Sequence, residues 1–296
     1  MKEFKSGFVT IIGRPNVGKS TLLNKVLGEK IAIMSDKPQT TRNKIQCIVT
    51  KEEHQIIFID TPGIHKPKHK LGEIMVKSAT ETFSEVDVVL FVVECDAVVG
   101  HGDKFIAEMI GNTKTPVILV INKIDTIKKE ELFKVINVFK DLYNFSAIIP
   151  ISAINGDGIE ILLSEIKNIL PAGPKYFPDD MITDQPEKQI VSEMIREKVL
   201  HHIEDEIPHG VAVEITSMKQ RGNKQIIDIQ ATIICEKDSH KGIIIGKNGA
   251  MLKKIGQLSR LDIERFLGTK VFLELWVKVK NDWRNSDNML KTLGYK

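Results

Sequence analysis

The chain has 296 residues, of which 42% are hydrophobic and 27% are charged, and its net charge is +3. This is the composition of an ordinary globular protein, and the length is sufficient for two hydrophobic cores. The longest apolar runs are too short for a bilayer and residues 1–10 include no signal-peptide core, so we expect neither a membrane span nor secretion and place the protein in the cytoplasm.

Short β-branched runs alternate with helical stretches between Gly7 and about Leu170. Runs this apolar are typical of strands that are covered on both faces, so we predict an α/β fold with a mostly parallel sheet and flanking helices. The second and third runs are joined by only KEE and predict a hairpin, which makes the sheet mixed. The predicted strands are 8–13, 44–50, 54–60, 87–93, 116–122 and 147–152.

A proline-rich segment follows this region. Residues 171–188 contain four prolines, which disfavour both helix and strand interiors. We therefore expect a first domain at 1–173, a linker at 174–186 and a second domain at 187–296. The three cysteines, Cys47, Cys95 and Cys235, are far apart and form no CxxC pair, so we expect reduced thiols in the core.

The second domain has a different order of elements. A helix with apolar positions from Ile190 to Ile203 leads to two antiparallel strands at 211–220 and 225–234. A short helix, the loop GKNG at 246–249, a helix at 250–266 and a strand at 270–280 complete an α+β unit. We expect both tryptophans, Trp276 and Trp283, to lie in its core, with base stacking as the alternative for Trp283.

Charge is distributed unevenly along the chain. Residues 217–296 carry 16 Lys and Arg against 8 Asp and Glu. This end of the chain is therefore the candidate binder of a polyanion, and a solvated charged face is the alternative.

A phosphate-binding loop follows the first predicted strand. The sequence GRPNVGKS at 13–20 matches the P-loop pattern GxxxxGK[ST] between a strand and a helix. Lys19 would reach the β- and γ-phosphates, and the Ser20 hydroxyl would bind Mg²⁺. The pattern alone does not decide which nucleotide binds. The residues expected to contact it are Gly13, Arg14, Pro15, Asn16, Val17, Gly18, Lys19, Ser20 and Thr21.

Two motifs at later strand ends select the base. Asn122-Lys123-Ile124-Asp125 follows a buried strand at the carboxyl edge of the sheet, where α/β proteins bind ligands. In GTPases an NKxD here presents its aspartate to the N1–H and 2-amino group of guanine, donors that adenine lacks. Ser152 and Ala153 follow the next apolar strand. Together with the P-loop, these residues favour guanine over adenine.

The motif Asp60-Thr61-Pro62-Gly63 ends the strand at 54–60. Asp60 would hold the Mg²⁺ shell through water, and the Gly63 N–H would meet the γ-phosphate. The polar segment 36–44 must supply a threonine that senses the same groups; Thr40 and Thr41 both qualify, and we favour Thr41. Segments that only a γ-phosphate anchors loosen after hydrolysis, which predicts a switch. The expected metal set is Ser20, Thr41 and Asp60, and the groups expected to act in hydrolysis are Lys19, Asn16, Thr41 and Gly63.

The motifs GRPNVGKS, QTTR, DTPG, NKID and SA, in this order and spacing, resemble the Ras-like GTPase fold and in particular the Era branch of bacterial GTPases. The resemblance implies hydrolysis of GTP to GDP with Mg²⁺. One departure from Ras-type GTPases is Ile64, which stands where they have a water-orienting glutamine, so we expect slow hydrolysis unless another group helps. In related GTPases an asparagine at the position of Asn16 is associated with bound K⁺; the alternative is that Asn16 only stabilises the turn.

The GKNG loop resembles the GxxG turn of a type II KH domain, in which four single-stranded nucleotides lie between the loop and the sheet edge. Lys247 and the N-terminus of the next helix would meet phosphate, and Ile243 to Ile245 would pack in the core and line the groove floor. A helix-helix turn without a ligand is the alternative. The residues expected to contact RNA are Ile243, Ile244, Gly246, Lys247, Asn248, Gly249, Lys253 and Lys254.

Era proteins join these two domains in this order, and the resemblance covers nearly the whole chain. It implies binding of the 3′ end of small-subunit ribosomal RNA and a role in maturation of the small (30S) subunit, and peripheral association with the inner membrane is reported for the family. We expect a monomer that acts as a GTP-driven RNA-binding switch. The alternatives are a GTPase of RNA modification and a passive RNA-binding protein whose nucleotide site is structural.

Overall fold

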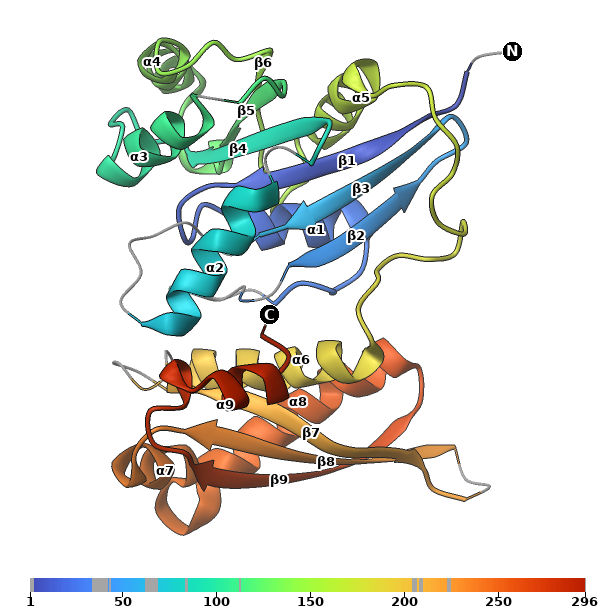
Figure 1. Ribbon diagram of the computed structural model, residues 1–296, viewed down its shortest axis with the longest axis vertical. Coiled ribbons are helices and arrows are strands. Elements are labelled where there is room, and N and C mark those ends of the chain that lie inside the picture. The colour runs from blue at the N-terminus through green and yellow to red at the C-terminus, as the bar shows by residue number, and fades with distance from the viewer. Residues whose placement is uncertain are drawn as a thin grey trace. The chain divides into compact units, whose positions relative to one another are not determined.

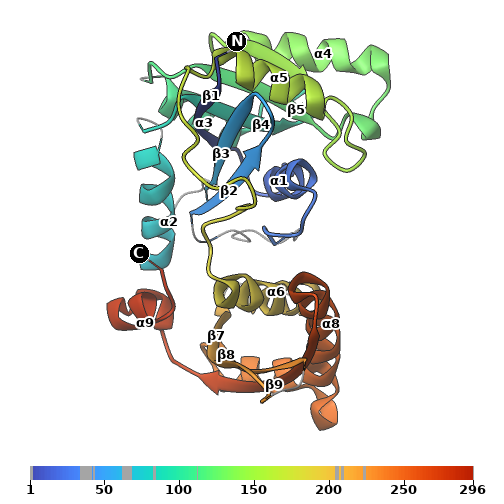
Figure 2. The ribbon, with the colours of Figure 1, turned by 90° about the vertical axis from the view of Figure 1, so that its right-hand side faces the viewer.

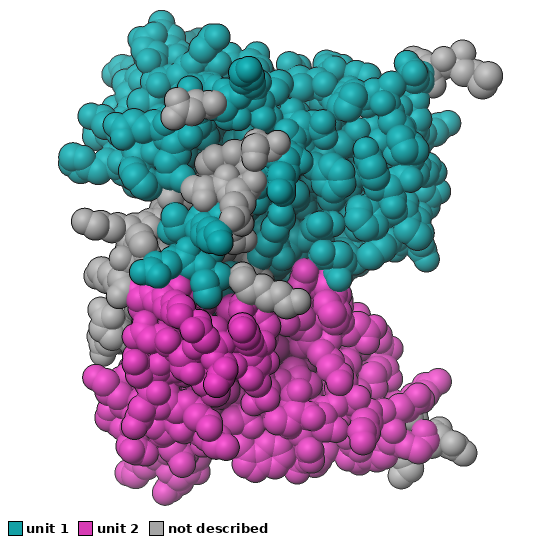
Figure 3. All heavy atoms as spheres, in the orientation of Figure 1, with its two compact units in different colours: residues 1–32, 39–68, 72–184 teal, residues 33–38, 69–71, 185–296 magenta. Residues whose placement is uncertain are grey.

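The computed structural model describes residues 3–33, 42, 44–61, 69–82, 85–111, 113–203, 207, 210–222 and 225–295. The chain forms two compact units, the first built from residues up to 184 and the second mainly from residues 185–296 (Figure 3). Each unit has a sheet of its own.

The sheet of the first unit has six strands in the order β2-β3-β1-β4-β5-β6. β2 and β3 form the expected antiparallel hairpin, and every other neighbouring pair is parallel. The predicted α/β fold with a mixed, mostly parallel sheet is thereby confirmed (Figure 1). The strands are β1 (Lys5–Ile12), β2 (Ile45–Thr50), β3 (His54–Asp60), β4 (Val88–Glu94), β5 (Val117–Asn122) and β6 (Ala147–Pro150).

Helices cover both faces of this sheet, which explains its uninterrupted apolar runs. Figure 2 shows α1 and α2 on opposite sides of β2 and β3. On one face, alternate residues of β4 and β5 such as Phe91 and Leu119 pack against Ile106 of α3 and Phe139 of α4 in a fully buried cluster. The helices are α1 (Lys19–Leu27), α2 (Lys70–Glu81), α3 (His101–Ile110), α4 (Lys129–Lys140) and α5 (Ile159–Ile169).

The proline-rich segment is held along the β2–β3 hairpin. Buried Gln55 accepts hydrogen bonds from the N–H groups of Tyr176 (2.8 Å) and Phe177 (3.0 Å) and donates to the Phe177 carbonyl (2.8 Å). Further along, Thr183 donates its hydroxyl to the carbonyl of Gln46 (2.7 Å). These side-chain bonds supplement the few backbone bonds that a segment with four prolines makes to the hairpin.

The second unit is a three-stranded sheet in the order β7-β8-β9, with β7 and β8 antiparallel and β8 and β9 parallel. Helices α6 and α8 pack against each other and against β7 and β9 respectively (Figures 1 and 2). This is the predicted helix-strand-strand-helix-helix-strand order with one further short helix at its end. The elements are α6 (Glu187–His202), β7 (Ala212–Gln220), β8 (Ile226–Cys235), α7 (Asp238–Ile245), α8 (Ala250–Leu267), β9 (Lys270–Val279) and α9 (Asp287–Thr292).

The two tryptophans have opposite environments. Trp283 is fully buried, donates its indole N–H to the Gly210 carbonyl (2.9 Å) and stacks on Tyr295 with ring centroids 6.0 Å apart. Its predicted place in the core is confirmed. Trp276 is 47% exposed, so the expectation that it packs in the core was wrong. The reason is strand alternation, because Trp276 lies on the same face of β9 as exposed Lys278.

All three cysteines are buried, and none of them forms a disulfide. In the ranges that the structure describes, no helix combines the length and the apolar character needed to cross a bilayer.

Candidate functional site

The loop between β1 and α1 is shaped by two glycines that approach neighbouring elements closely. A side chain on Gly13 would lie 2.3 Å from the Val92 carbonyl oxygen, and one on Gly18 would lie 2.2 Å from the Asn122 side-chain nitrogen. Gly18 also has a φ of 95° and is the N-cap of α1. Any side chain at these positions would push the loop away from the sheet, so the cradle depends on glycine. Asn16 has a φ of 69°, a left-handed conformation that asparagine tolerates.

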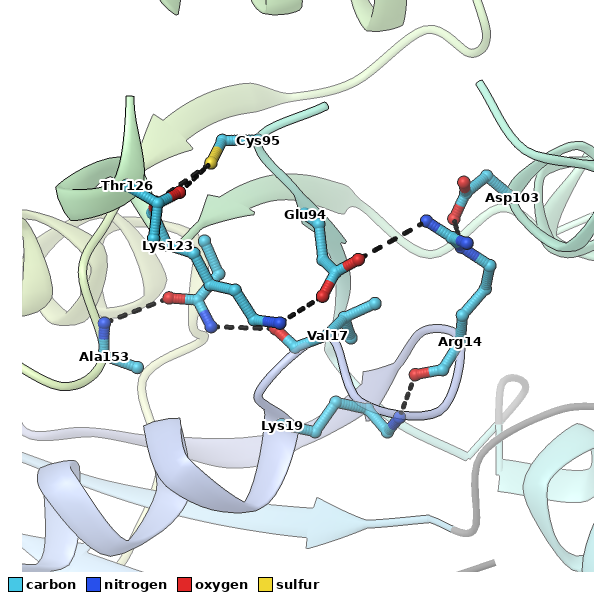
Figure 4. A network of polar contacts seen from close by, with 10 residues as sticks. Arg14, Val17, Lys19, Glu94, Cys95, Asp103, Lys123, Thr126 and Ala153 are labelled. Atoms are coloured by element: carbon cyan, nitrogen blue, oxygen red, sulfur yellow. Dashed lines mark hydrogen bonds and ion pairs between the residues drawn. The ribbon is translucent and has the colours of Figure 1, made fainter. Parts of the chain in front are cut away.

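The side chain of Lys19 is folded into this loop. It is 7% exposed, and its ammonium donates hydrogen bonds to the carbonyl oxygens of Gly13 (3.0 Å) and Arg14 (2.7 Å), as Figure 4 shows for Arg14. Burial lowers the pKa of Lys19 to about 8, an effect that the negative charge of Asp60 partly offsets. The loop therefore holds a poorly solvated cation beside a helix N-terminus, an arrangement that suits a phosphate group.

Asp60 and Thr61 lie beside the same loop at the carboxyl end of β3. Both are fully buried, and the parallel register pairs Asp60 with Ile11, two residues before the loop begins. The Thr61 hydroxyl donates to the Ile11 carbonyl (2.9 Å) and fixes the start of the motif. Ser20 lies in the first turn of α1. The carboxylate and hydroxyl thus come from two adjacent elements and are oxygen donors of the kind that Mg²⁺ prefers.

Several predicted residues fall outside the described ranges. These are Thr40, Thr41, Pro62, Gly63 and Ile64.

Asn122 joins the P-loop to the two base-selecting motifs. This residue, 1% exposed, donates its side-chain amide to the Val17 carbonyl (2.8 Å) and accepts from the Ala153 N–H (3.0 Å). The structure therefore brings together three segments that are far apart in the sequence (Figure 4). Because both bonds are buried, Asn122 links the P-loop to the loop at Ala153 in addition to being part of the NKxD pattern.

Asp125, three residues after Asn122, is exposed, and the Ser152 hydroxyl donates a hydrogen bond of 2.5 Å to one oxygen of its carboxylate. The bond orients the carboxylate and leaves acceptor capacity for a ligand with two adjacent N–H donors, as guanine has.

Lys123 takes a left-handed conformation with a φ of 68° and forms an ion pair with Glu94. Its carbonyl accepts a hydrogen bond from the Cys95 thiol (2.9 Å).

The second unit presents the GKNG turn between α7 and α8. Lys247 and Asn248 are exposed, and Asn248 has a φ of 51°. A side chain on Gly246 would lie 2.9 Å from the Met251 backbone nitrogen, so a close backbone approach requires glycine there. Ile244 is fully buried, whereas Ile243 is 50% exposed, so the expectation that 243–245 pack in the core holds for Ile244 and is wrong for Ile243.

A groove of about 460 Å³ opens beside this turn between α8 and β9. Its α8 side carries Lys253 and Arg260, and its β9 side carries Leu273 and Leu275. Gly256 narrows the distance between the two elements, because a side chain there would already contact the Leu275 methyl at 3.4 Å. The groove thus combines an apolar floor with a cationic rim. Lys254 is exposed and is not among its lining residues. Residues 243–245 do not line it either, so the expectation that they form its floor was wrong; the apolar side chains come from α8 and β9 instead.

Comparison with known proteins agrees with both sites. The family described as 50S ribosome-binding GTPase matches residues 8–123, and the family described as KH domain matches residues 206–284. The chain is 62% identical to GTPase Era of Alkaliphilus metalliredigens (strain QYMF) and 61% identical to GTPase Era of Clostridioides difficile (strain 630), in each case over 99% of both chains. The chain belongs to the Era family of GTPases.

Solved structures of Era support the same assignment. One, a crystal structure of Era in complex with MgGDPNP and nucleotides 1506–1542 of 16S ribosomal RNA, has a TM-score of 0.95 and 40% identity over 99% of both chains. A variant of Aquifex aeolicus Era bound to GDP and AlF₄⁻ has a TM-score of 0.94 and 39% identity over 99% of both chains. The predicted Era resemblance, the Ras-like GTPase domain followed by a KH domain, and GTPase activity are thereby confirmed.

One set of contacts beside the P-loop was not predicted. Arg14 was predicted as a P-loop residue, but its ion pairs were not: the guanidinium donates to buried Asp103 of α3 (2.8 Å) and lies 4.0 Å from Glu94 (Figure 4). Asp103 also accepts from the Gly100 N–H (3.1 Å) at the start of α3. The HGD sequence after a strand could have indicated an N-terminal cap, but no local pattern indicates its second bond to the P-loop.

Proposed function

We propose that the protein is a GTP-driven switch that binds the 3′ end of small-subunit ribosomal RNA through the α8–β9 groove and assists maturation of the 30S subunit. The observation that carries this proposal is the GKNG turn, in which Lys247 and Asn248 are exposed and Gly249 lines a groove with an apolar floor. Such a groove accepts unstacked bases while the turn approaches the RNA backbone. An Era structure 40% identical to this chain contains 16S ribosomal RNA.

In the nucleotide site, GTP would bind with Mg²⁺. The fit is supported by the glycine-shaped cradle, by the buried ammonium of Lys19 and by the adjacent Asp60 carboxylate. Bound Mg²⁺ would neutralise charge on the phosphate oxygens. Ser20, Asp60 and Thr41 would hold it, Lys19 and the Gly63 N–H would bind phosphate oxygens, and Asp125 would select guanine. Because Ile64 cannot orient water, turnover in the free protein would be slow.

We also retain K⁺ as an activating ion near Asn16. The left-handed backbone of this residue favours the alternative role in the turn, so a salt comparison is required. GTP turnover measured at equal ionic strength in KCl and NaCl should be faster in KCl, and Asn16→Asp should alter the ratio. Equal rates in the two salts would contradict the proposal.

The protein is further proposed to be a cytoplasmic monomer with reversible attachment to the inner membrane. Light scattering of the purified chain and co-sedimentation with anionic vesicles test these two points separately.

The experiment that tests the switch is RNA-stimulated turnover. Phosphate release should rise when an unstructured RNA copied from the 3′ end of small-subunit rRNA is added, and the double variant Lys247→Asp, Asn248→Asp should abolish the stimulation while leaving basal turnover unchanged. A passive RNA-binding protein would bind this RNA with no change in turnover. A matched control is Lys128→Asp, an exposed lysine in the first unit at the start of α4.

A further inference from the structure

The second face of the β7–β9 sheet carries two exposed aromatic side chains. Helices α6 and α8 pack on one face, and strand alternation directs Leu273 and Leu275 of β9 toward α8. Phe272 and Trp276 point the other way and are 48% and 47% exposed. They are separated by four residues on one strand, or about 13 Å. Two large aromatic rings on one solvated sheet face make this face a candidate binding surface.

The two rings differ in what contacts them. The guanidinium of Arg221 lies 4.7 Å from the centroid of Phe272, and Asp228 of the neighbouring strand holds it by a hydrogen bond of 2.9 Å. The contact with Asp228 thus holds the guanidinium over the ring. Among the residues that the structure describes, no ring or cation stacks on Trp276, and its 47% exposure leaves part of the indole available to a ligand.

This face is continuous with the α8–β9 groove. β9 is the edge strand of the sheet, and its alternate residues line the groove and the outer face. A strand of RNA that leaves the groove needs to pass only the edge of β9 to reach Trp276. Phe272 and Trp276 are the exposed aromatic residues that the structure describes on β9.

Charge on the outer face is nearly balanced, which restricts the mode of binding. The register across the three strands places four cations and three acids on this face: Lys219, Arg221, Lys270, Lys278, Glu214, Asp228 and Glu274. Asp228 is paired with Arg221, and Glu274 accepts a hydrogen bond from Gln230 (3.1 Å). A face with little net charge and exposed aromatic rings suits stacking of bases more than attraction of phosphates.

We propose that the outer face of this sheet is a second RNA-binding surface, on which unpaired bases flanking those in the groove stack on Trp276 and on the Arg221–Phe272 pair. The proposal rests on the RNA-binding function proposed above and extends it from four nucleotides to a longer segment. The occupant is single-stranded RNA because the surface shares β9 with the groove and because every base offers a flat face to an aromatic ring.

The test compares two RNA lengths at two salt concentrations. One probe is a four-nucleotide RNA that fills only the groove, and the other is an unstructured RNA of about twelve nucleotides from the 3′ end of small-subunit rRNA. Trp276→Ala should weaken binding of the long RNA by about tenfold or more and leave the affinity for the short RNA unchanged. Because stacking does not release counterions, the tenfold factor should be the same in low and high salt, whereas the effect of Lys247→Asp, Asn248→Asp should shrink as salt rises.

The tryptophan itself supplies a direct readout. The chain has two tryptophans, and Trp283 is fully buried, so quenchable emission comes from Trp276. The long RNA should quench this emission in the unaltered protein, and Trp276→Phe should keep most of the affinity but lose the quenching. Phe133→Ala, which removes a 70% exposed ring from α4 in the first unit, is the matched control and should change neither quantity.

Each outcome has a separate meaning. Equal affinity of Trp276→Ala and the unaltered protein for the long RNA, or unquenched Trp276 at saturation, would overturn the stacking surface. Normal binding of both RNAs by the Lys247→Asp, Asn248→Asp variant would instead refute the groove and the proposed function. A concentration-dependent dimer in light scattering that vanishes in Trp276→Ala would assign this face to a second copy of the chain and overturn the proposal as well.

Discussion

Replacing Asn122 by alanine should destabilise the first unit specifically. The side chain makes two buried hydrogen bonds, to the Val17 carbonyl at 2.8 Å and from the Ala153 N–H at 3.0 Å. Each bond contributes about 1 kcal/mol net, and an unsatisfied buried backbone group costs about 1–3 kcal/mol. We therefore expect a loss of about 3 kcal/mol, which for a unit of this size lowers Tm by roughly 6–12 °C.

The two units can be observed separately in the full chain. Both tryptophans are in the second unit, so their fluorescence follows that unit alone, whereas far-ultraviolet circular dichroism follows both. In Asn122→Ala the dichroism should develop an early transition while the fluorescence transition stays in place. Asn155→Ala removes an exposed asparagine from the neighbouring loop and is the matched control, expected to change stability by less than about 0.5 kcal/mol.

Nucleotide binding should be affected in the same variant. Without the bond to Val17, the P-loop is no longer tied to the base-selecting loops, so GDP should dissociate faster. If Asn122→Ala unfolds at the same temperature as Asn155→Ala and releases GDP at the rate of the unaltered protein, Asn122 does not have the linking role that we assign to it.

Three further predictions concern other residues. Because burial lowers the pKa of Lys19 to about 8 from 10.5, the affinity for GDP should fall about tenfold per pH unit above pH 8, as measured by titration calorimetry. Over the same range, from pH 8 toward pH 10.5, the nucleotide-free first unit should become more stable, because the folded state loses a buried charge. In Lys19→Arg both trends should vanish. Asp125→Asn should favour XDP over GDP in competition binding, because the new amide donates to the carbonyl of xanthine; unchanged GDP preference would refute the role of Asp125. Trp283→Ala should destabilise the second unit by about 3–5 kcal/mol in urea unfolding, and a loss below 1 kcal/mol would contradict its place in the core.

Most strands of the fold were predictable because the signal is local. Runs such as 116–122 are β-branched and bounded by breakers, and β5 begins within one residue of the prediction. β1 begins at Lys5 rather than residue 8, because Lys5, Ser6 and Gly7 pair with β3 although polar residues and glycine favour strands weakly. Pairing with β3, and not the local sequence, places those three residues in the strand.

The parts of the site that are sequence motifs were predictable, whereas contacts between side chains far apart in the sequence were not. The Arg14–Asp103 bond joins residues 89 positions apart, and nothing in either local sequence indicates the other. Trp276 is a different case. The pattern that put Lys278 on the solvent face of its strand applies equally to a residue two positions earlier, so the exposure of Trp276 followed from the sequence but was outweighed by the general tendency of tryptophan to be buried.

The central claim is that nucleotide state controls RNA binding through the GKNG groove. The most direct test measures the affinity of the full chain for an unstructured RNA from the 3′ end of small-subunit rRNA with a GTP analogue and with GDP, beside the Lys247→Asp, Asn248→Asp variant. The account predicts tighter binding with the GTP analogue and loss of binding in the variant. Equal affinity in the two nucleotide states would contradict the switch, and normal binding by the variant would contradict the groove.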